Sequence, residues 1–194
     1  MNNRGQLFVL SGSSGGGKTT IIHEVLSIRK DFVFSVSSTT REPREHEKEG
    51  VDYHFLKRDE FLKRRDAGEF IEWAEVHKHL YGTEHRQIDK MLELGQNVIL
   101  DLDVYGASSI HDLFPNAVLI FIFPPSVEEL RRRLENRGTN TPEQIELRLS
   151  RYPFERARGE AYPYHVLNDN LMDTVDSVLE IIEDVISFRA KRSI

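Results

Sequence analysis

The 194-residue chain has no cysteine, which excludes disulfide frameworks and thiolate metal sites and is consistent with a reducing compartment. Long apolar runs are also lacking. The run "AVLIFIF" at residues 117–123 is far shorter than the roughly 20 residues that span a bilayer. The first ten residues, "MNNRGQLFVL", do not have the pattern of a secretory signal. We therefore expect a cytoplasmic protein that does not associate with membranes.

An excess of positive charge is lacking as well, because 26 Lys and Arg face 32 Asp and Glu, for a net charge of −6. General nucleic-acid binders carry a basic surface, so we expect no nucleic-acid partner, and any basic site must be local. With 39% hydrophobic and 30% charged residues, the composition is that of an ordinary globular protein. No Gly-, Pro- or Ser-rich linker interrupts the chain, so we expect one domain over residues 1–194. The oligomeric state stays open.

Apolar runs and helix-period segments alternate along the chain. The runs are continuous rather than alternating with polar residues, which favours parallel strands covered on both faces in an α/β fold. Ser126 and Thr141 each precede a capping pattern, in "SVEE" and "TPEQ", and predict helix starts. An apolar stripe from Val175 to Ile186 predicts a closing helix that packs on the core. Strands are predicted at residues 6–12, 32–37, 95–104, 117–125 and 164–169, and further helices at 18–30 and 58–68.

The motif "GSSGGGKT" lies between a predicted strand and a predicted helix. Glycines let the backbone close around phosphate oxygens and direct N–H groups and the helix N-terminus at the anion. Lysine then contacts the β and γ phosphates, and the threonine hydroxyl ligates Mg²⁺. The alternative, a merely flexible turn, does not require the flanking strand and helix. The motif predicts an ATP site formed by Gly12, Ser13, Ser14, Gly15, Gly16, Gly17, Lys18, Thr19 and Thr20.

Two aspartates, Asp101 and Asp103, stand at the polar end of a predicted buried strand, in "VILDLDVYG". Residues two apart in a strand share one face, and ligands of open α/β sheets bind at the carboxyl ends of strands. One aspartate is suited to hold Mg²⁺ through water and the other to bind a second substrate. An ordinary strand-to-turn boundary, where aspartate is common, is the alternative, and the phosphate-binding motif favours the functional interpretation.

Eight segments, in this order, resemble the guanylate kinases over essentially the whole chain: "GSSGGGKTT", "FSVSSTTREPR", "GVDYHF", "GEFIEWAEVH", "YGT", "ILDLDVYGA", "FIFPPSVEELRRRLENRGT" and "VLND". The resemblance implies a P-loop nucleoside monophosphate kinase with a three-layer α/β/α core and a parallel central sheet. It implies transfer of the γ-phosphoryl group of ATP to GMP, and to dGMP. It assigns residues 1–36, 86–130 and 160–194 to the core, 37–85 to a GMP-binding insertion and about 131–159 to a helical lid.

The same resemblance implies a set of GMP-binding residues. Arginine binds a phosphate bidentately, and a carboxylate, which only accepts, pairs with the adjacent N1–H and N2–H₂ of guanine and rejects adenine. Tyrosine hydroxyls add bonds to the phosphate. The matching positions are Arg41, Arg44, Tyr53 and Tyr81 for the phosphate, Glu72, Ser37, Thr83 and Asp103 for the base, and Asp101 beside them.

On the ATP side, the resemblance implies that Arg133, Arg137 and Arg148 of the lid reach the ATP base or phosphates, and that Asn168 lies near adenine. Mg²⁺ is implied at Thr19, and at Asp101 through water. No general base is required, because the second pKa of a phosphate monoester is about 6. Catalysis then consists of alignment, charge neutralisation and exclusion of water.

The chain departs from the family pattern in three places. His46 stands where a turn glycine is usual, Lys78 and His79 replace a frequent Gly-Asn, and Pro153 falls within a predicted helix. We therefore expect a changed loop at His46, a small displacement of Tyr81, and a helix that kinks or restarts at Pro153.

Other interpretations are kept open. Arg41 and Arg44 alone would suggest a solvated cluster with Glu42, Glu45 and Glu47. The pair His77 and His79 lacks further ligands at metal-binding spacing, which favours structural or surface histidines. The fold also serves as a protein-binding scaffold, and related P-loop kinases phosphorylate other acceptors such as phosphorylated sugars. The intact P-loop argues against the first, and the guanine-matching residues against the second.

Overall fold

The computed structural model describes residues 4–45, 47–76, 78–138 and 140–192. Its centre is a five-stranded sheet in the order β2-β7-β1-β8-β9, and all pairings in it are parallel. The prediction of a parallel α/β fold is confirmed. The strands are β1 (Leu7–Gly12), β2 (Phe32–Phe34), β7 (Asn97–Leu102), β8 (Val118–Phe123) and β9 (Tyr164–Leu167).

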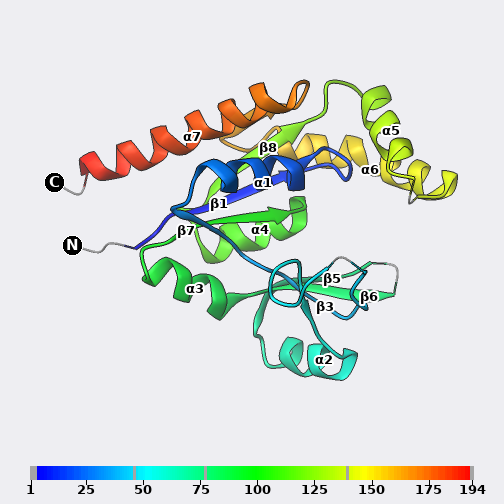
Figure 1. Cartoon of the computed structure of the whole chain (residues 1–194), viewed down its shortest axis with the longest axis horizontal. Helices are drawn as coiled ribbons and strands as arrows, with labels where there is room; N and C mark the ends of the chain where they lie inside the picture. The colour runs from blue at the N-terminus through cyan, green and yellow to red at the C-terminus, as the bar shows by residue number, and fades with distance from the viewer. Residues whose placement is uncertain (1–3, 46, 77, 139, 193–194) are drawn as a thin grey trace.

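Helices cover both faces of this sheet and complete three layers (Figure 1). Side chains alternate along β1. Phe8 and Leu10 pack with α1 (Lys18–Ile28) and α7 (Leu171–Arg192), whereas Leu7 and Val9 pack with α3 (His85–Glu93) and α4 (Val104–Leu113). Both sets are almost fully buried. Burial on both faces explains why the strands are apolar at every position rather than at alternate ones.

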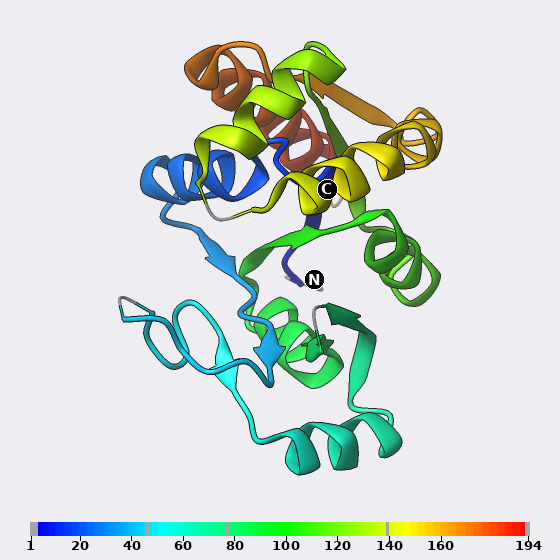
Figure 2. The same cartoon turned by 90° about the vertical axis from the view of Figure 1, so that its right-hand side faces the viewer.

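A second, smaller sheet lies below the central one (Figure 2). Its order is β4-β3-β6-β5, with antiparallel β3/β6 and β5/β6 pairs and a parallel β3/β4 pair. Helix α2 (Arg58–Asp66) packs on it through Phe61, whose ring stacks on Phe70 at 4.3 Å between centroids. The sequence predicted only the helix here. The strands are β3 (Ser38–Thr39), β4 (His54–Phe55), β5 (Phe70–Val76) and β6 (His79–Glu84).

Helices α5 (Val127–Asn136) and α6 (Pro142–Gly159) form the third unit, and both predicted starts are confirmed. Ser126 Oγ accepts from Glu129 N, and Thr141 forms a capping box with Gln144. The expected restart at Pro153 is wrong, since α6 runs unbroken through it. Proline removes one N–H but has a helical φ. Before the proline, Ile145, Leu149 and Tyr152 are buried against α5, and after it Gly159 is buried beside Phe121 of the central sheet.

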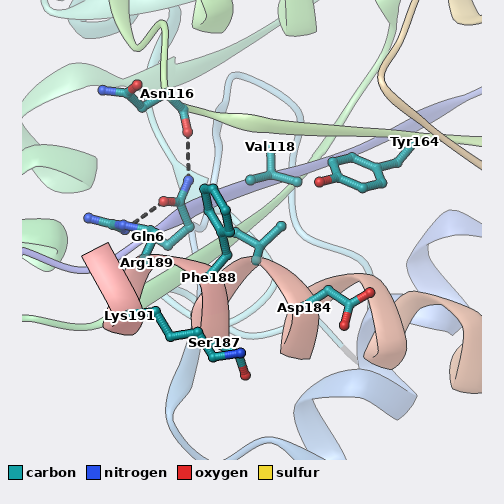
Figure 3. A pocket seen from close by; sticks show the side chains of 10 residues that line it. Gln6, Asn116, Val118, Tyr164, Asp184, Ser187, Phe188, Arg189 and Lys191 are labelled. Carbon is teal, nitrogen blue, oxygen red and sulfur yellow. Dashed lines mark hydrogen bonds between the residues drawn. The ribbon is translucent and has the colours of Figure 1, made fainter. Parts of the chain in front are cut away.

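The C-terminal helix α7 is tied to the start of β1. Arg189 Nη1 donates to Gln6 Oε1 at 2.5 Å, and Gln6 Nε2 donates to Asn116 O at 2.6 Å (Figure 3). A cavity of about 870 Å³ beside this contact lies at the amino ends of the strands, at the edge opposite the P-loop. Within the described ranges, no helix combines the length and apolarity needed to cross a membrane.

The chain turns between β5 and β6 at Lys78, which has a left-handed φ of 69°. This is one of the positions where glycine is usual in the family that the sequence resembles. A side chain in this conformation costs about 1 kcal/mol or more, because Cβ approaches the carbonyl oxygen. The lysine therefore preserves the backbone conformation of the turn under strain.

We expect Lys78→Gly to raise the free energy of unfolding by about 1 kcal/mol, because glycine relieves this strain. Lys63→Gly, at an exposed site within α2, should lower it by about 1 kcal/mol, because glycine is a poor helix former. Urea unfolding of both variants measures the two changes. Loss of stability in both would contradict the strained turn.

Candidate active site

The predicted P-loop emerges from the carboxyl end of β1 and leads into α1. Gly15 and Gly17 have φ values of 89° and 91°, a region that glycine adopts without strain. Lys18 Nζ donates to Gly12 O at 2.9 Å and to Ser13 O at 3.3 Å. The ammonium group is thus curled over the loop, at the position where a bound phosphate chain would lie. Thr20 follows on the exposed side of the helix.

Asp101 lies directly beside this loop because β7 pairs with β1 in the register Leu10↔Asp101. Thr19 Oγ1 donates to Asp101 Oδ2 at 2.7 Å, and Lys18 Nζ lies 3.7 Å from Asp101 Oδ1. A hydroxyl and a carboxylate are hard oxygen donors that fit Mg²⁺, which takes few protein ligands and fills its shell with phosphate and water oxygens. No cluster of three or more His, Asp or Glu suited to a metal occurs within the described ranges.

Asp103 does not share a strand face with Asp101, because β7 ends at Leu102. That part of the prediction is wrong. Asp103 is instead the N-cap of α4, where its Oδ1 accepts from Tyr105 N and Gly106 N, both at 2.9 Å. Its charge still acts on the predicted base site, since it helps to raise the pKa of Glu72.

Glu72 on β5 is half-buried, and loss of solvent around its carboxylate is the main cause of its raised pKa. Its Oε1 accepts from Thr83 Oγ1 at 2.6 Å, and Thr83 Oγ1 lies 3.5 Å from Ser37 Oγ. The β5/β6 register places Glu72 opposite Thr83. The three residues predicted to read the base are therefore brought together, with Asp103 across from them.

Arg41 forms a bidentate ion pair with Glu47, with N–O distances of 2.8 and 2.7 Å. This pairing raises the pKa of Arg41. Glu47 Oε2 also accepts from Arg44 N at 2.8 Å, so one carboxylate fixes both predicted phosphate-binding arginines. His46, where a changed loop was expected, lies outside the described residues.

Two tyrosines flank this arginine. The ring centroids of Tyr53 and Tyr81 are 5.9 Å apart, and Arg41 Cζ lies 5.5 Å from the Tyr53 centroid. Burial raises the pKa of Tyr53, and the charge of Asp101 adds to the shift. Three of the residues predicted to bind the acceptor phosphate, Arg41, Tyr53 and Tyr81, therefore lie in one cluster.

The α5–α6 unit contacts the P-loop from the other side. Arg148 Nη1 donates to Ser14 Oγ, and burial lowers the pKa of Arg148, with Arg137 as a further cause. Arg133 Nη2 donates to Asn168 O at 2.8 Å, while Asn168 Nδ2 donates to Gly16 O at 2.7 Å. Arg148 thus contacts the P-loop directly, and Arg133 contacts it through Asn168. Arg137 is the C-cap residue of α5.

Comparisons with known proteins agree with this geometry. The family model described as guanylate kinase matches residues 4–185. The chain belongs to the guanylate kinase family. A guanylate kinase of Thermotoga maritima is 46% identical over 188 residues, covering 97% of this chain and 89% of that protein. One from Clostridium perfringens strain SM101 is 44% identical, with coverages of 93% and 84%. The crystal structure of guanylate kinase from Anaplasma phagocytophilum superposes with a TM-score of 0.75, at 36% identity and coverages of 93% and 86%.

Family membership over nearly the full length confirms the resemblance and the predicted reaction. The chain is a guanylate kinase in activity, catalysing the ATP-dependent phosphorylation of GMP to GDP. The scaffold and sugar-phosphate interpretations are thereby set aside.

Sequence reasoning missed some residues that shape the guanylate kinase site. Glu47 was considered only as part of a solvated cluster, yet it anchors Arg41 and the Arg44 backbone. Thr174 Oγ1 donates to Asn168 Oδ1 at 3.2 Å and holds that amide toward the P-loop. The one sequence signal for Glu47 was an acid six residues after an arginine, and such spacing has no meaning until a loop folds back.

We expect Gly17→Ala to disrupt the nucleotide site. A Cβ at Gly17 would lie 2.4 Å from Asn168 Nδ2, and the positive φ adds strain. The matched control Gly68→Ala has a φ of 70° with no atom within 4 Å, so only strain of about 1 kcal/mol applies. Gly17→Ala should lower the free energy of unfolding by about 2 kcal/mol or more, because the hydrogen bond from Asn168 Nδ2 to Gly16 O is lost as well.

Urea unfolding and ATP titration calorimetry test this difference. ATP affinity should fall in Gly17→Ala and stay unchanged in Gly68→Ala. Equal behaviour of the two variants would show that Asn168 does not shape the loop.

Proposed function

We propose that the γ-phosphoryl group of ATP passes directly and in line to the phosphate of GMP, and also of dGMP, at the junction of the two sheets. The supporting observation is that Glu72 and Asp103 line one cavity, while Asp101, two residues before Asp103, accepts a hydrogen bond from Thr19 of the P-loop. In this proposal the donor phosphates lie on the P-loop with Lys18, and the acceptor phosphate lies against Arg41, Arg44, Tyr53 and Tyr81. Alignment of the two anions then supplies most of the catalysis.

The chain supplies positive charge and N–H groups rather than a base. The acceptor phosphate is mostly deprotonated at neutral pH, because its second pKa is about 6. Lys18, Arg41 and Arg148 neutralise charge that develops on the transferred group and the leaving oxygen. Arg133 and Arg137, at the C-terminal end of α5, add further positive charge in this proposal.

Mg²⁺ bound with ATP would be held by the Thr19 hydroxyl and, through water, by Asp101, and it would neutralise phosphate charge. Their mutual hydrogen bond of 2.7 Å shows that both oxygens reach one point beside Lys18. Asp101 also keeps Lys18 turned toward the loop.

Guanine selection falls to Glu72 in this proposal. Its carboxylate only accepts hydrogen bonds, so it pairs with N1–H and N2–H₂ of guanine and is left unpaired against adenine. Thr83 Oγ1 donates a hydrogen bond to Glu72 Oε1 and thereby fixes the direction of the carboxylate, which keeps further acceptor capacity for the base. Ser37 and Asp103 complete the base site.

The remaining assignments are proposals of the same kind. Residues 37–85 act as the GMP-binding region, and about 131–159 act as the lid over ATP. The core consists of 1–36, 86–130 and 160–194, with Asn168 beside adenine. We place the protein in the cytoplasm, where its substrates ATP and GMP are found.

An acceptor screen tests the proposal. With ATP and Mg²⁺, the purified chain should release ADP when GMP or dGMP is added. Turnover with AMP or CMP should be lower by about 10⁴, the discrimination typical of a site built to hydrogen-bond its substrate. A coupled ADP-release assay measures the rates. Equal turnover with AMP would overturn the guanine assignment, and loss of turnover with dGMP alone would restrict it to GMP.

A second prediction concerns Glu72 and pH. GMP binds the ionised carboxylate, so affinity falls as the pH falls through the pKa of Glu72. Burial raises that pKa, so the loss should begin at a higher pH than for an exposed glutamate. Glu72→Gln should lower GMP affinity and relax the choice between GMP and AMP.

GMP is titrated into the wild-type protein and into Glu72→Gln between pH 5 and 8. Protonation of the GMP phosphate affects both proteins alike, so their affinity ratio reports the titration of Glu72 alone. The wild-type to Glu72→Gln affinity ratio should decrease toward acid pH. A ratio independent of pH, or an unchanged preference for GMP in the variant, would remove Glu72 as the base reader.

A further inference from the structure

Two exposed aromatic rings join α4 to α6. Tyr105 and Phe154 are stacked, with 5.4 Å between ring centroids and 22° between planes, although they are 63% and 42% exposed. Arg158 Cζ lies 5.4 Å from the Phe154 centroid and extends the stack. Stacking costs each exposed ring rotamer freedom that it would keep in solvent, so the pair is a specific contact between the two helices.

On the α4 side, the stack begins in the turn that borders the base site. Tyr105 N is one of the two N–H groups bound by Asp103, and Gly106 follows it. A Cβ added at Gly106 would lie 3.4 Å from Glu72 Cγ, so this turn lies next to the proposed base reader. A cavity of about 410 Å³ is lined by Glu72, Trp73, Asp103 and Tyr105 together.

On the α6 side, the stack continues into the phosphate site. Phe154 and Arg148 belong to one unbroken helix, and Arg148 donates to Ser14 of the P-loop. The position of Phe154 relative to α4 is therefore linked to the position of Arg148 over the nucleotide. The Tyr105–Phe154 stack therefore lies between the cavity lined by Glu72 and the helix whose Arg148 donates to Ser14.

We propose that the Tyr105–Phe154 stack couples the GMP site to the lid, so that each substrate strengthens the binding of the other. In the structure the stack joins α6 to α4, and in this proposal it forms only in that lid position. GMP fixes Glu72 and the first turn of α4, which favours the stacked lid position, and that position brings Arg148 to ATP. Tyr105 and Phe154 are positioning residues, and this inference rests on the proposed roles of Glu72 and of the lid.

The size of the coupling follows from aromatic energetics. Aromatic pairs contribute roughly 0.5–1.5 kcal/mol beyond area burial, which is a factor of about 2 to 12 in binding. By thermodynamic linkage the factor is the same whichever substrate binds first. Loss of the stack should reduce the factor by which the nucleotide enhances GMP affinity.

The experiment measures GMP affinity with and without a non-hydrolysable ATP analogue and Mg²⁺. Trp73 is the single tryptophan and lines the cavity beside Glu72, so its fluorescence reports GMP binding. Tyr105→Ala and Phe154→Ala should each reduce the enhancement about 2- to 12-fold. The double variant should lose no more than either single one.

Matched controls come from the same helices. Leu113→Ala on α4 and Leu147→Ala on α6, each 53% exposed, should keep the full enhancement. Tyr105→Phe and Phe154→Tyr should also keep it, because the rings still stack. Tyr105→Leu and Phe154→Leu, which retain bulk without a ring, should lose it, and they serve as a second set if an alanine variant is unstable.

Absence of enhancement in the wild type, additive losses in the double variant, or full enhancement in the leucine variants would each overturn the inference. Failure of the proposed function has a different signature. ADP release would then be independent of GMP in the wild-type chain, whatever the binding data show.

Discussion

Asp101 is the point on which both halves of the site depend. Parallel pairing of β7 with β1 places its carboxylate where Thr19 donates to it and Lys18 lies nearby. The position of the P-loop relative to the proposed metal ligand Asp101 is set by this one register. A slip of one residue would turn the carboxylate to the opposite face of the sheet, toward helix packing instead of phosphate. The buried apolar strands hold that register far more strongly than the polar contacts do.

The core of the fold was predictable because its signals are local and strong. Continuous apolar runs gave the parallel strands, and capping residues at Ser126 and Thr141 gave the starts of α5 and α6. The small sheet was not predicted. Its strands β3 and β4 have two residues each, too few for a periodic pattern, and they exist only through pairing with distant segments. Tertiary contacts, not propensity, form them.

In the candidate site, too, residues with a local sequence signal were predicted, and residues whose role depends on tertiary contacts were not. Lys18 and Thr19 were identified by the P-loop motif, and Glu72 by the resemblance to the guanylate kinases. Asp103 was assigned to the wrong element, since a two-residue spacing was interpreted as strand when the chain had already turned into α4. Glu47 went unrecognised because its role depends on the fold of a loop. Pro153 shows that packing can outweigh one lost hydrogen bond, so that a local rule for breaking helices fails.

The ion pair between Arg41 and Glu47 has a wider consequence. Because the protein provides its own counterion, the acceptor site is electrically balanced before substrate arrives. If the GMP phosphate binds Arg41 as proposed, it replaces the Glu47 carboxylate as the partner of this arginine and displaces few dissolved counterions. Stray anions gain little from such a pocket, and its occupancy should respond only weakly to ionic strength. An acidic protein can in this way keep arginines for a single phosphate without attracting polyanions at large.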